Sequence, residues 1–144
     1  MEKTSSSIAE ALKQAHRTLL ADLRTLENAA RRSAKTDPAE LSTRLAATRT
    51  HLADHFKFEE QDGYMDAVRK REPRLERVIQ QIAEEHGDIT QSLDALIGEV
   101  RGAGELGDAV REKVRTWIKR VRRHEARENE LVQGAFNLDI SAED

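Results

Sequence analysis

The chain has 144 residues, of which 35% are charged and 3% are aromatic, and its formal net charge is −3. This length suits one domain, and the charge balance requires neither nucleic acid nor a membrane surface as a partner. The absence of cysteine excludes disulfides, thiolate metal sites and cysteine nucleophiles. No apolar run approaches the roughly 18 residues of a membrane span and no secretory signal is apparent, so we expect a cytoplasmic protein.

Four long segments have the apolar periodicity of helices, with turn-forming residues between them. The predicted helices cover about 5–33, 38–68, 74–101 and 107–133, and an acidic tail follows at 137–144. Asp37 and Pro38 are typical of an N-cap and a first helical residue, and Gly63 is expected to kink the second helix or end it early. Short connections imply antiparallel neighbours. We therefore predict a single all-α domain, an antiparallel up-down-up-down four-helix bundle.

The apolar positions in each segment follow alternating steps of three and four residues, which is the spacing of a helix face packed inside a bundle. Six polar residues interrupt these faces. They are His16, His55, Glu59, His86, His124 and Glu128. Buried histidine and glutamate cost free energy unless they are paired or bind a metal. A hydrogen-bonded core histidine would explain any one of them alone, but six together favour another explanation.

Their positions in the sequence predict that these side chains meet. In an antiparallel pair of helices, two residues lie at the same height when their midpoint falls in the connecting loop. The midpoint is 35.5 for His16 and His55, 72.5 for Glu59 and His86, and 105 for His86 and His124. Each value falls within a predicted loop, so we expect one polar level inside the bundle.

The two halves of the chain also form a weak internal repeat. A shift of 69 or 70 residues places His16 on His86, His55 on His124 and Glu59 on Glu128. Each half supplies one histidine and then a His-x-x-x-Glu pair, whose two members share one helix face. Two such half-sites suit two metal ions, with a carboxylate from each half free to bridge them.

Four imidazoles and two carboxylates without sulfur suit iron, manganese or zinc. Two glutamates would leave two such ions with net positive charge, which an oxo or hydroxo bridge commonly lowers. A structural zinc site would use four ligands around one ion, so six ligands argue against it. The ferritin-like pattern requires Glu-x-x-His, whereas this chain has His-x-x-x-Glu.

The stretches "HFKFEE" (55–60), "EEH" (84–86) and "HEARENEL" (124–131), with His16 upstream, resemble the hemerythrin-like domains that carry His-His-Glu cation-binding motifs. The resemblance covers about residues 8–136. It implies a non-haem centre that binds two iron ions joined by an oxo or hydroxo bridge. Manganese or zinc is less favoured as the bound metal. The implied ligands are terminal His16, His55, His86 and His124 with bridging Glu59 and Glu128. Thr90 and Asn129 stand where the oxygen carriers have histidine and aspartate, so the chain is similar to the four-histidine, two-glutamate subgroup.

His51 precedes His55 by one helical turn and is a further candidate. We consider three roles for it: a fifth nitrogen ligand, a hydrogen-bond partner outside the ligands, or a boundary histidine in contact with solvent. Tyr64 is not expected to bind metal, and Trp117 is expected to pack in the core.

Three functions are compatible with these features. The resemblance favours a di-iron protein that binds or reacts with dioxygen, nitric oxide or peroxide, and a peroxide- or nitric-oxide-reactive oxidoreductase is one form of it. No catalytic side chain can be named. The alternative is an iron or oxygen sensor, or an iron-storage module, that acts through a protein partner or a second copy without turnover. A plain helical interaction protein is the third hypothesis.

Overall fold

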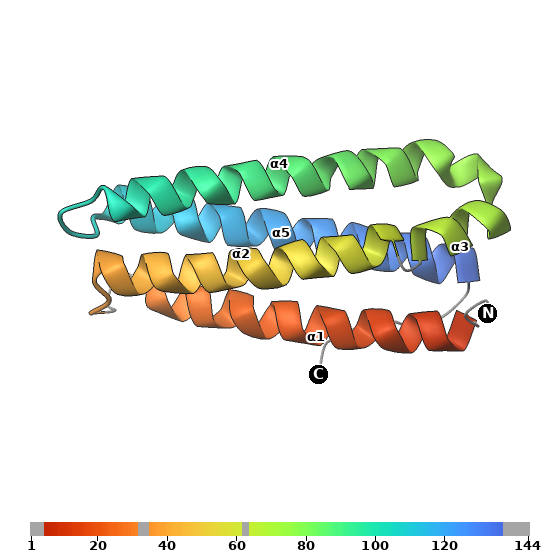
Figure 1. Cartoon of the computed structure of the whole chain (residues 1–144), viewed down its shortest axis with the longest axis horizontal. Helices are drawn as coiled ribbons and strands as arrows, with labels where there is room; N and C mark the ends of the chain where they lie inside the picture. Colours follow the sequence, from red (N-terminus) through yellow and green to blue (C-terminus); the bar gives the residue numbers. More distant parts are fainter. Residues whose placement is uncertain (1–4, 32–34, 62–63, 137–144) are drawn as a thin grey trace.

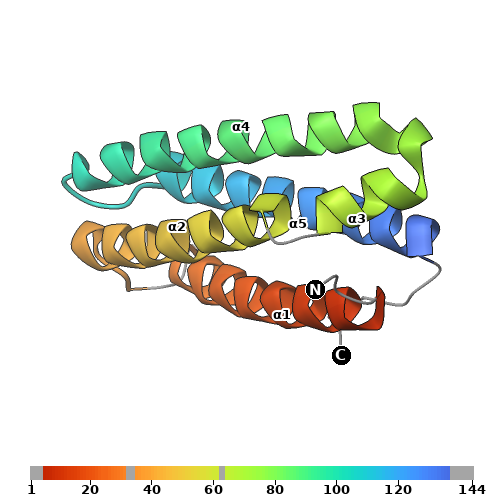
Figure 2. The same ribbon diagram turned by 45° about the vertical axis from the view of Figure 1, so that its right-hand side comes forward.

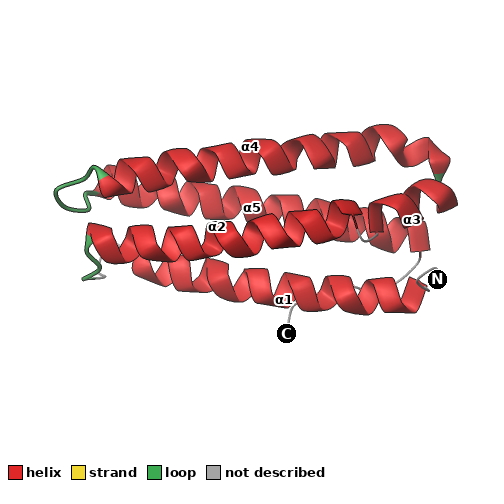
Figure 3. Cartoon of the chain, in the orientation of Figure 1, coloured by secondary structure: helices red, strands yellow, loops and turns green. Residues whose placement is uncertain are grey.

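The computed structural model describes residues 5–31, 35–61 and 64–136, and within these ranges it contains helices and no strand (Figures 1 and 3). The helices are α1 (Ser5–Ala29), α2 (Pro38–Gln61), α3 (Tyr64–Arg71), α4 (Glu76–Arg101) and α5 (Asp108–Phe136), with a 3-10 turn, η1 (Pro73–Leu75), before α4. The four long helices, α1, α2, α4 and α5, form a bundle. The predicted all-α four-helix bundle is confirmed.

The long helices alternate in direction, and each packs against two neighbours (Figures 1 and 2). Helix α1 lies against α2 and α5, and α4 lies against the same two helices on the opposite side. This is the arrangement that short connections between antiparallel helices produce. It brings one face of every long helix to a common axis. None of the described helices combines the length and apolar composition that crossing a membrane requires.

The second predicted helix is interrupted in the structure. It was expected to run over 38–68, but α2 ends at Gln61 and a separate short helix, α3, begins at Tyr64. Gly63, the residue expected to kink or end this helix, lies outside the described residues. Helix α3 buries Tyr64, Met65 and Val68, so the segment after the break still contributes to the core.

Two side chains fix the ends of the helices near the α1–α2 and α4–α5 connections. The Glu40 amide donates to Asp37 Oδ1 at 2.8 Å, which confirms Asp37 as the N-cap of α2. The Arg111 guanidinium, buried at the start of α5, donates to the carbonyl of Ala29, the last residue of α1, at 3.5 Å and to that of Arg31 at 2.6 Å. Carbonyls at the end of a helix have no partner within it, so these contacts tie the end of α1 to α5.

The apolar core consists of two clusters on either side of a polar level. One cluster contains Leu19, Leu52, Ile89 and Val121, together with Trp117, which is 4% exposed as expected of a core residue. The other contains Leu12, Tyr64, Ile82 and Leu131. On α1, α4 and α5 the predicted histidines and glutamate fall between a residue of the first cluster and a residue of the second. On α2, His55 and Glu59 follow Leu52 of the first cluster, and the second cluster resumes at Tyr64 on α3. The bundle therefore holds its polar residues away from both ends.

Candidate metal centre

All six predicted site residues are buried in the bundle, with exposures from 0% to 6%. Helix α1 supplies His16, α2 supplies His55 and Glu59, α4 supplies His86, and α5 supplies His124 and Glu128. The structure brings them together, with one further residue, in two groups of side chains that share a member. In each group the potential ligand atoms lie within 4.8 Å of one another.

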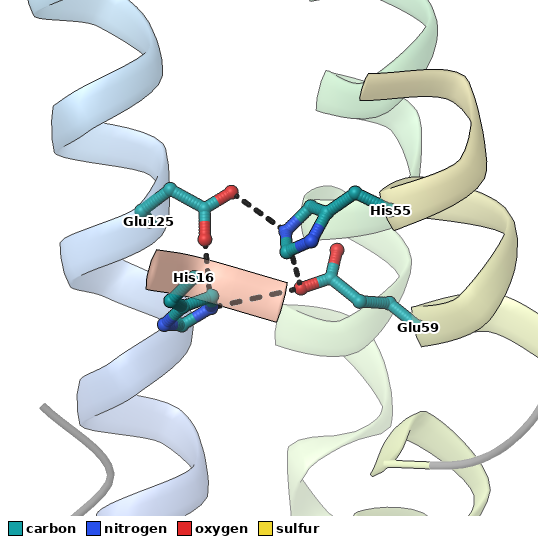
Figure 4. A group of neighbouring side chains, drawn as sticks. All are labelled: His16, His55, Glu59 and Glu125. Carbon is teal, nitrogen blue, oxygen red and sulfur yellow. Dashed lines mark hydrogen bonds and ion pairs between the residues drawn. The ribbon is translucent and has the colours of Figure 1, made fainter. Parts of the chain in front are cut away.

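The first group contains His16, His55, Glu59 and Glu125 (Figure 4). Glu125 joins the two histidines: its Oε2 lies 2.7 Å from His16 Nε2, and its Oε1 lies 3.0 Å from His55 Nε2. Glu59 is the fourth member of the group, and its Oε2 lies 3.2 Å from His55 Nε2. Two imidazoles and two carboxylates thus converge from α1, α2 and α5.

The second group contains Glu59, His86, His124 and Glu128. Glu59 Oε1 lies 3.4 Å from His86 Nε2, and Glu128 Oε1 lies 3.6 Å from the same nitrogen. His124 Nε2 contacts Glu128 Oε1 as well. Glu59 therefore directs one oxygen to each group, as a carboxylate that bridges two ions would.

Glu125 was not predicted from the sequence. It is 5% exposed and takes part in the first group as fully as any predicted residue. The three-and-four spacing includes Val121, His124 and Glu128, and it passes over Glu125. Yet Glu125 is four residues after buried Val121, so it lies on the same helix face, and this signal was available in the sequence.

Tyr64 was not predicted near the ligands either. Its hydroxyl donates to Glu128 Oε2 at 2.8 Å, and the side chain is 1% exposed. Tyr64 is the first residue of α3, so this contact comes from α3 and not from α2. Glu128 belongs to the second group alone. Its contacts with the histidines reach the second group only, so they do not support the bridging role that the resemblance implied for Glu128.

The two histidines of the second group have carboxylate partners on their outer nitrogens. His86 Nδ1 lies 2.6 Å from Glu60 Oε2, and His124 Nδ1 lies 2.7 Å from Glu85 Oε1. Arg127 pairs with the other oxygen of Glu85. An imidazole that donates through Nδ1 has its tautomer fixed, so its Nε2 lone pair is free for a metal.

His51 lies outside both groups. Its side chain is 48% exposed, and its Nδ1 is 2.6 Å from Asp22 Oδ2 on α1. Together with Ala15 and His55 it lines a cavity of about 260 Å³ between α1 and α2. The structure thus places His51 at the solvent edge of the bundle, which favours the third of its predicted roles.

Without a metal, the buried carboxylates affect one another's protonation. Burial raises the pKa of Glu59 well above its usual range, and the negative charge of Glu128 raises it further. Burial would also raise the pKa of Glu128, but close contacts with Glu59, His124 and His86 hold it well below its usual range. The pKa of His86 is raised to about 9: burial opposes the charged form, but the nearby carboxylates of Glu128 and Glu59 outweigh it. The cluster therefore holds protons where a cation would otherwise balance its charge.

Several atoms that face this centre are buried without a well-oriented hydrogen bond. They are Nε2 of His16, His86 and His124, both carboxylate oxygens of Glu59, Oε2 of Glu125 and Oε1 of Glu128. A native protein rarely leaves so many buried polar atoms unsatisfied, because each costs free energy. Imidazole nitrogens and carboxylate oxygens are metal ligands, so metal ions are the partners that fit this set.

The family model of the hemerythrin HHE cation-binding domain matches residues 7–136. The chain belongs to this family. The match covers α2, α4 and α5 in full, α1 from residue 7 onward and every member of both groups. It confirms the family indicated by the His-His-Glu motifs. No curated protein and no solved structure matches the chain in the comparisons.

Proposed function

We propose that this HHE domain holds two iron ions and that the pair binds or reacts with a small oxidant such as dioxygen, nitric oxide or peroxide. The first group would hold one ion and the second group the other. The ligands would be His16, His55 and Glu125 for one ion, His86, His124 and Glu128 for the other, and Glu59 for both.

The position of Glu59 carries this proposal. It is fully buried, and its two oxygens face His55 in one group and His86 in the other. A single-ion site would need only one of these groups. A carboxylate directed to two sets of ligands is the arrangement expected for a pair of ions in close proximity.

Iron in such a centre would supply the electrons for reduction of the oxidant, and the protein would supply a dry, shaped cavity. The proposed ligands are 0% to 6% exposed, so bulk water has little access to them. Manganese and zinc suit the same donor types, so the choice of iron over them rests on the family resemblance alone.

The test is reaction of the anaerobically reconstituted ferrous protein with peroxide, nitric oxide and dioxygen in turn. We expect near-ultraviolet absorption of a bridged ferric pair after reaction with an oxidant, and consumption of peroxide beyond one equivalent if the protein is an oxidoreductase. A single stoichiometric reaction without turnover would favour the sensor or storage alternative. No reaction with any of the three would contradict the proposal. The location of the protein in the cytoplasm and its binding to a protein partner stay predictions.

A further inference from the structure

The two groups are related by the internal repeat, and the structure preserves this relation in their contacts. The rings of His16 and His55 have centroids 5.5 Å apart, and those of their counterparts His86 and His124 are 4.9 Å apart. The histidine and glutamate of each His-x-x-x-Glu pair are also in contact in both halves. The two groups can therefore be compared residue by residue.

The first difference concerns the residue that follows the histidine of each pair. Glu125 contacts His16 at 2.7 Å. Its counterpart is Phe56, which stacks on His86 with ring centroids 3.8 Å apart and an angle of 6° between the planes. The second group thus has an apolar wall where the first has a carboxylate. Since Glu59 serves both groups, each still offers two imidazoles and two carboxylates.

The second difference lies outside the ligands. In the second group, Glu60 and Glu85 accept hydrogen bonds from the outer nitrogens of the two histidines. The repeat replaces Glu60 by Asn129 and Glu85 by Ala15. Neither of these residues can supply a carboxylate to the histidines of the first group.

His55 shows the consequence directly. Its side chain is 6% exposed, and its Nδ1 is buried without a hydrogen-bond partner. Ala15, the counterpart of Glu85, lines the cavity of about 260 Å³ that His55 also lines. The structure therefore has open space where the second group has a carboxylate partner.

We propose that the two metal positions are unequal: the second group retains its ion more tightly, and the first group holds an exchangeable one. Glu60 and Glu85 are the positioning residues that cause the difference. A carboxylate on the outer nitrogen orients the imidazole and makes it a stronger ligand, and losing such a partner typically lowers metal affinity 10–100-fold. This inference rests on the proposed pair of ions.

The test is an equilibrium titration of the two-iron ferrous protein with a chelator under anaerobic conditions, with iron per chain as the readout. We expect one ion to leave at a lower chelator concentration than the other. Glu85→Ala and Glu60→Ala should each weaken the tighter ion by about 10–100-fold and leave the weaker one unchanged. Glu85→Gln, which retains an acceptor oxygen, should restore part of the loss. Glu84→Ala is the matched control, because Glu84 is exposed on the same helix.

A gain of affinity provides the second arm. Ala15→Glu introduces the missing carboxylate beside His55, in a cavity with room for it, and should tighten the weaker ion. Release of both ions together in the unmodified protein, or weakening of the weaker ion by Glu85→Ala, would overturn the inequality. Fewer than two bound ions at the start would instead contradict the proposed metal pair, so the two failures are distinguishable.

Discussion

The aromatic ring of Phe56 lies flat on the imidazole of His86, with the two planes 6° apart. The same ring meets His124 edge-on, with centroids 5.6 Å apart. Phe56 is 5% exposed and belongs to the larger apolar cluster. One side chain thus connects the apolar packing of α2 to the orientation of two histidines on other helices.

Phe56→Leu should therefore affect both stability and metal binding. Loss of ring volume and of the stacked contact should lower the free energy of unfolding by about 1–3 kcal/mol. Urea denaturation of the metal-free protein measures this loss. Iron content should fall as well, because His86 loses the contact that holds its plane. Phe58→Leu, at a half-buried position on the same helix, should cost less, and equal losses for both variants would contradict the role of the stacking.

Glu59 and Glu128 should differ in their importance for metal content. Glu59 belongs to both groups and Glu128 to one, so Glu59→Gln should remove most of the iron from both positions. Glu128→Gln should leave about one ion per chain, because the first group keeps all its members. Metal analysis of the reconstituted variants gives the answer. Similar losses for the two variants would show that Glu59 is not the shared carboxylate.

The two histidines of α2 provide a matched pair. His55→Ala removes a member of the first group and should lower iron content to about one ion per chain. His51→Ala removes an exposed side chain paired with Asp22 and should leave the iron content unchanged. Atomic absorption on both variants, purified identically, tests this contrast. A loss of iron in His51→Ala would contradict this expectation and support His51 as a metal ligand.

Tyr64→Phe should destabilise the metal-free protein by about 1–3 kcal/mol, because the hydroxyl donates to the buried carboxylate of Glu128. Unfolding by urea measures the effect. The double variant with Glu128→Gln provides the control: if the two groups interact as the structure shows, the two losses should not add. Fully additive losses would mean that the hydroxyl contributes by packing alone.

The fold and the level of the site could be predicted because both follow from periodicity. Steps of three and four residues place Leu12, His16 and Leu19 on one face of α1, and the positions of the loops set the heights of the histidines. Spacing alone could not set the length of the second helix, because it extended this helix to residue 68. Only Gly63 indicated an earlier end, and the described helix α2 ends at Gln61.

The roles of Tyr64, Glu125 and Phe56 were not predicted from the spacing, for related reasons. Tyr64 contacts Glu128 from α3, whereas the spacing predicted one helix through residue 68. Glu125 follows a predicted ligand directly, so a rule that takes one residue per turn omits it, although its distance from Val121 placed it inside. Phe56 is part of the apolar core, and the repeat that makes it the counterpart of Glu125 becomes informative only when both sets of contacts are known.

The number of iron ions per chain tests the central claim most directly. The protein should be purified, freed of metal, reconstituted with ferrous ion under anaerobic conditions and analysed by native mass spectrometry, without a chelating step that would remove the weaker ion. The two groups that share Glu59 predict about two ions per chain in the unmodified protein. One ion per chain, or none, would contradict a paired metal centre in this bundle.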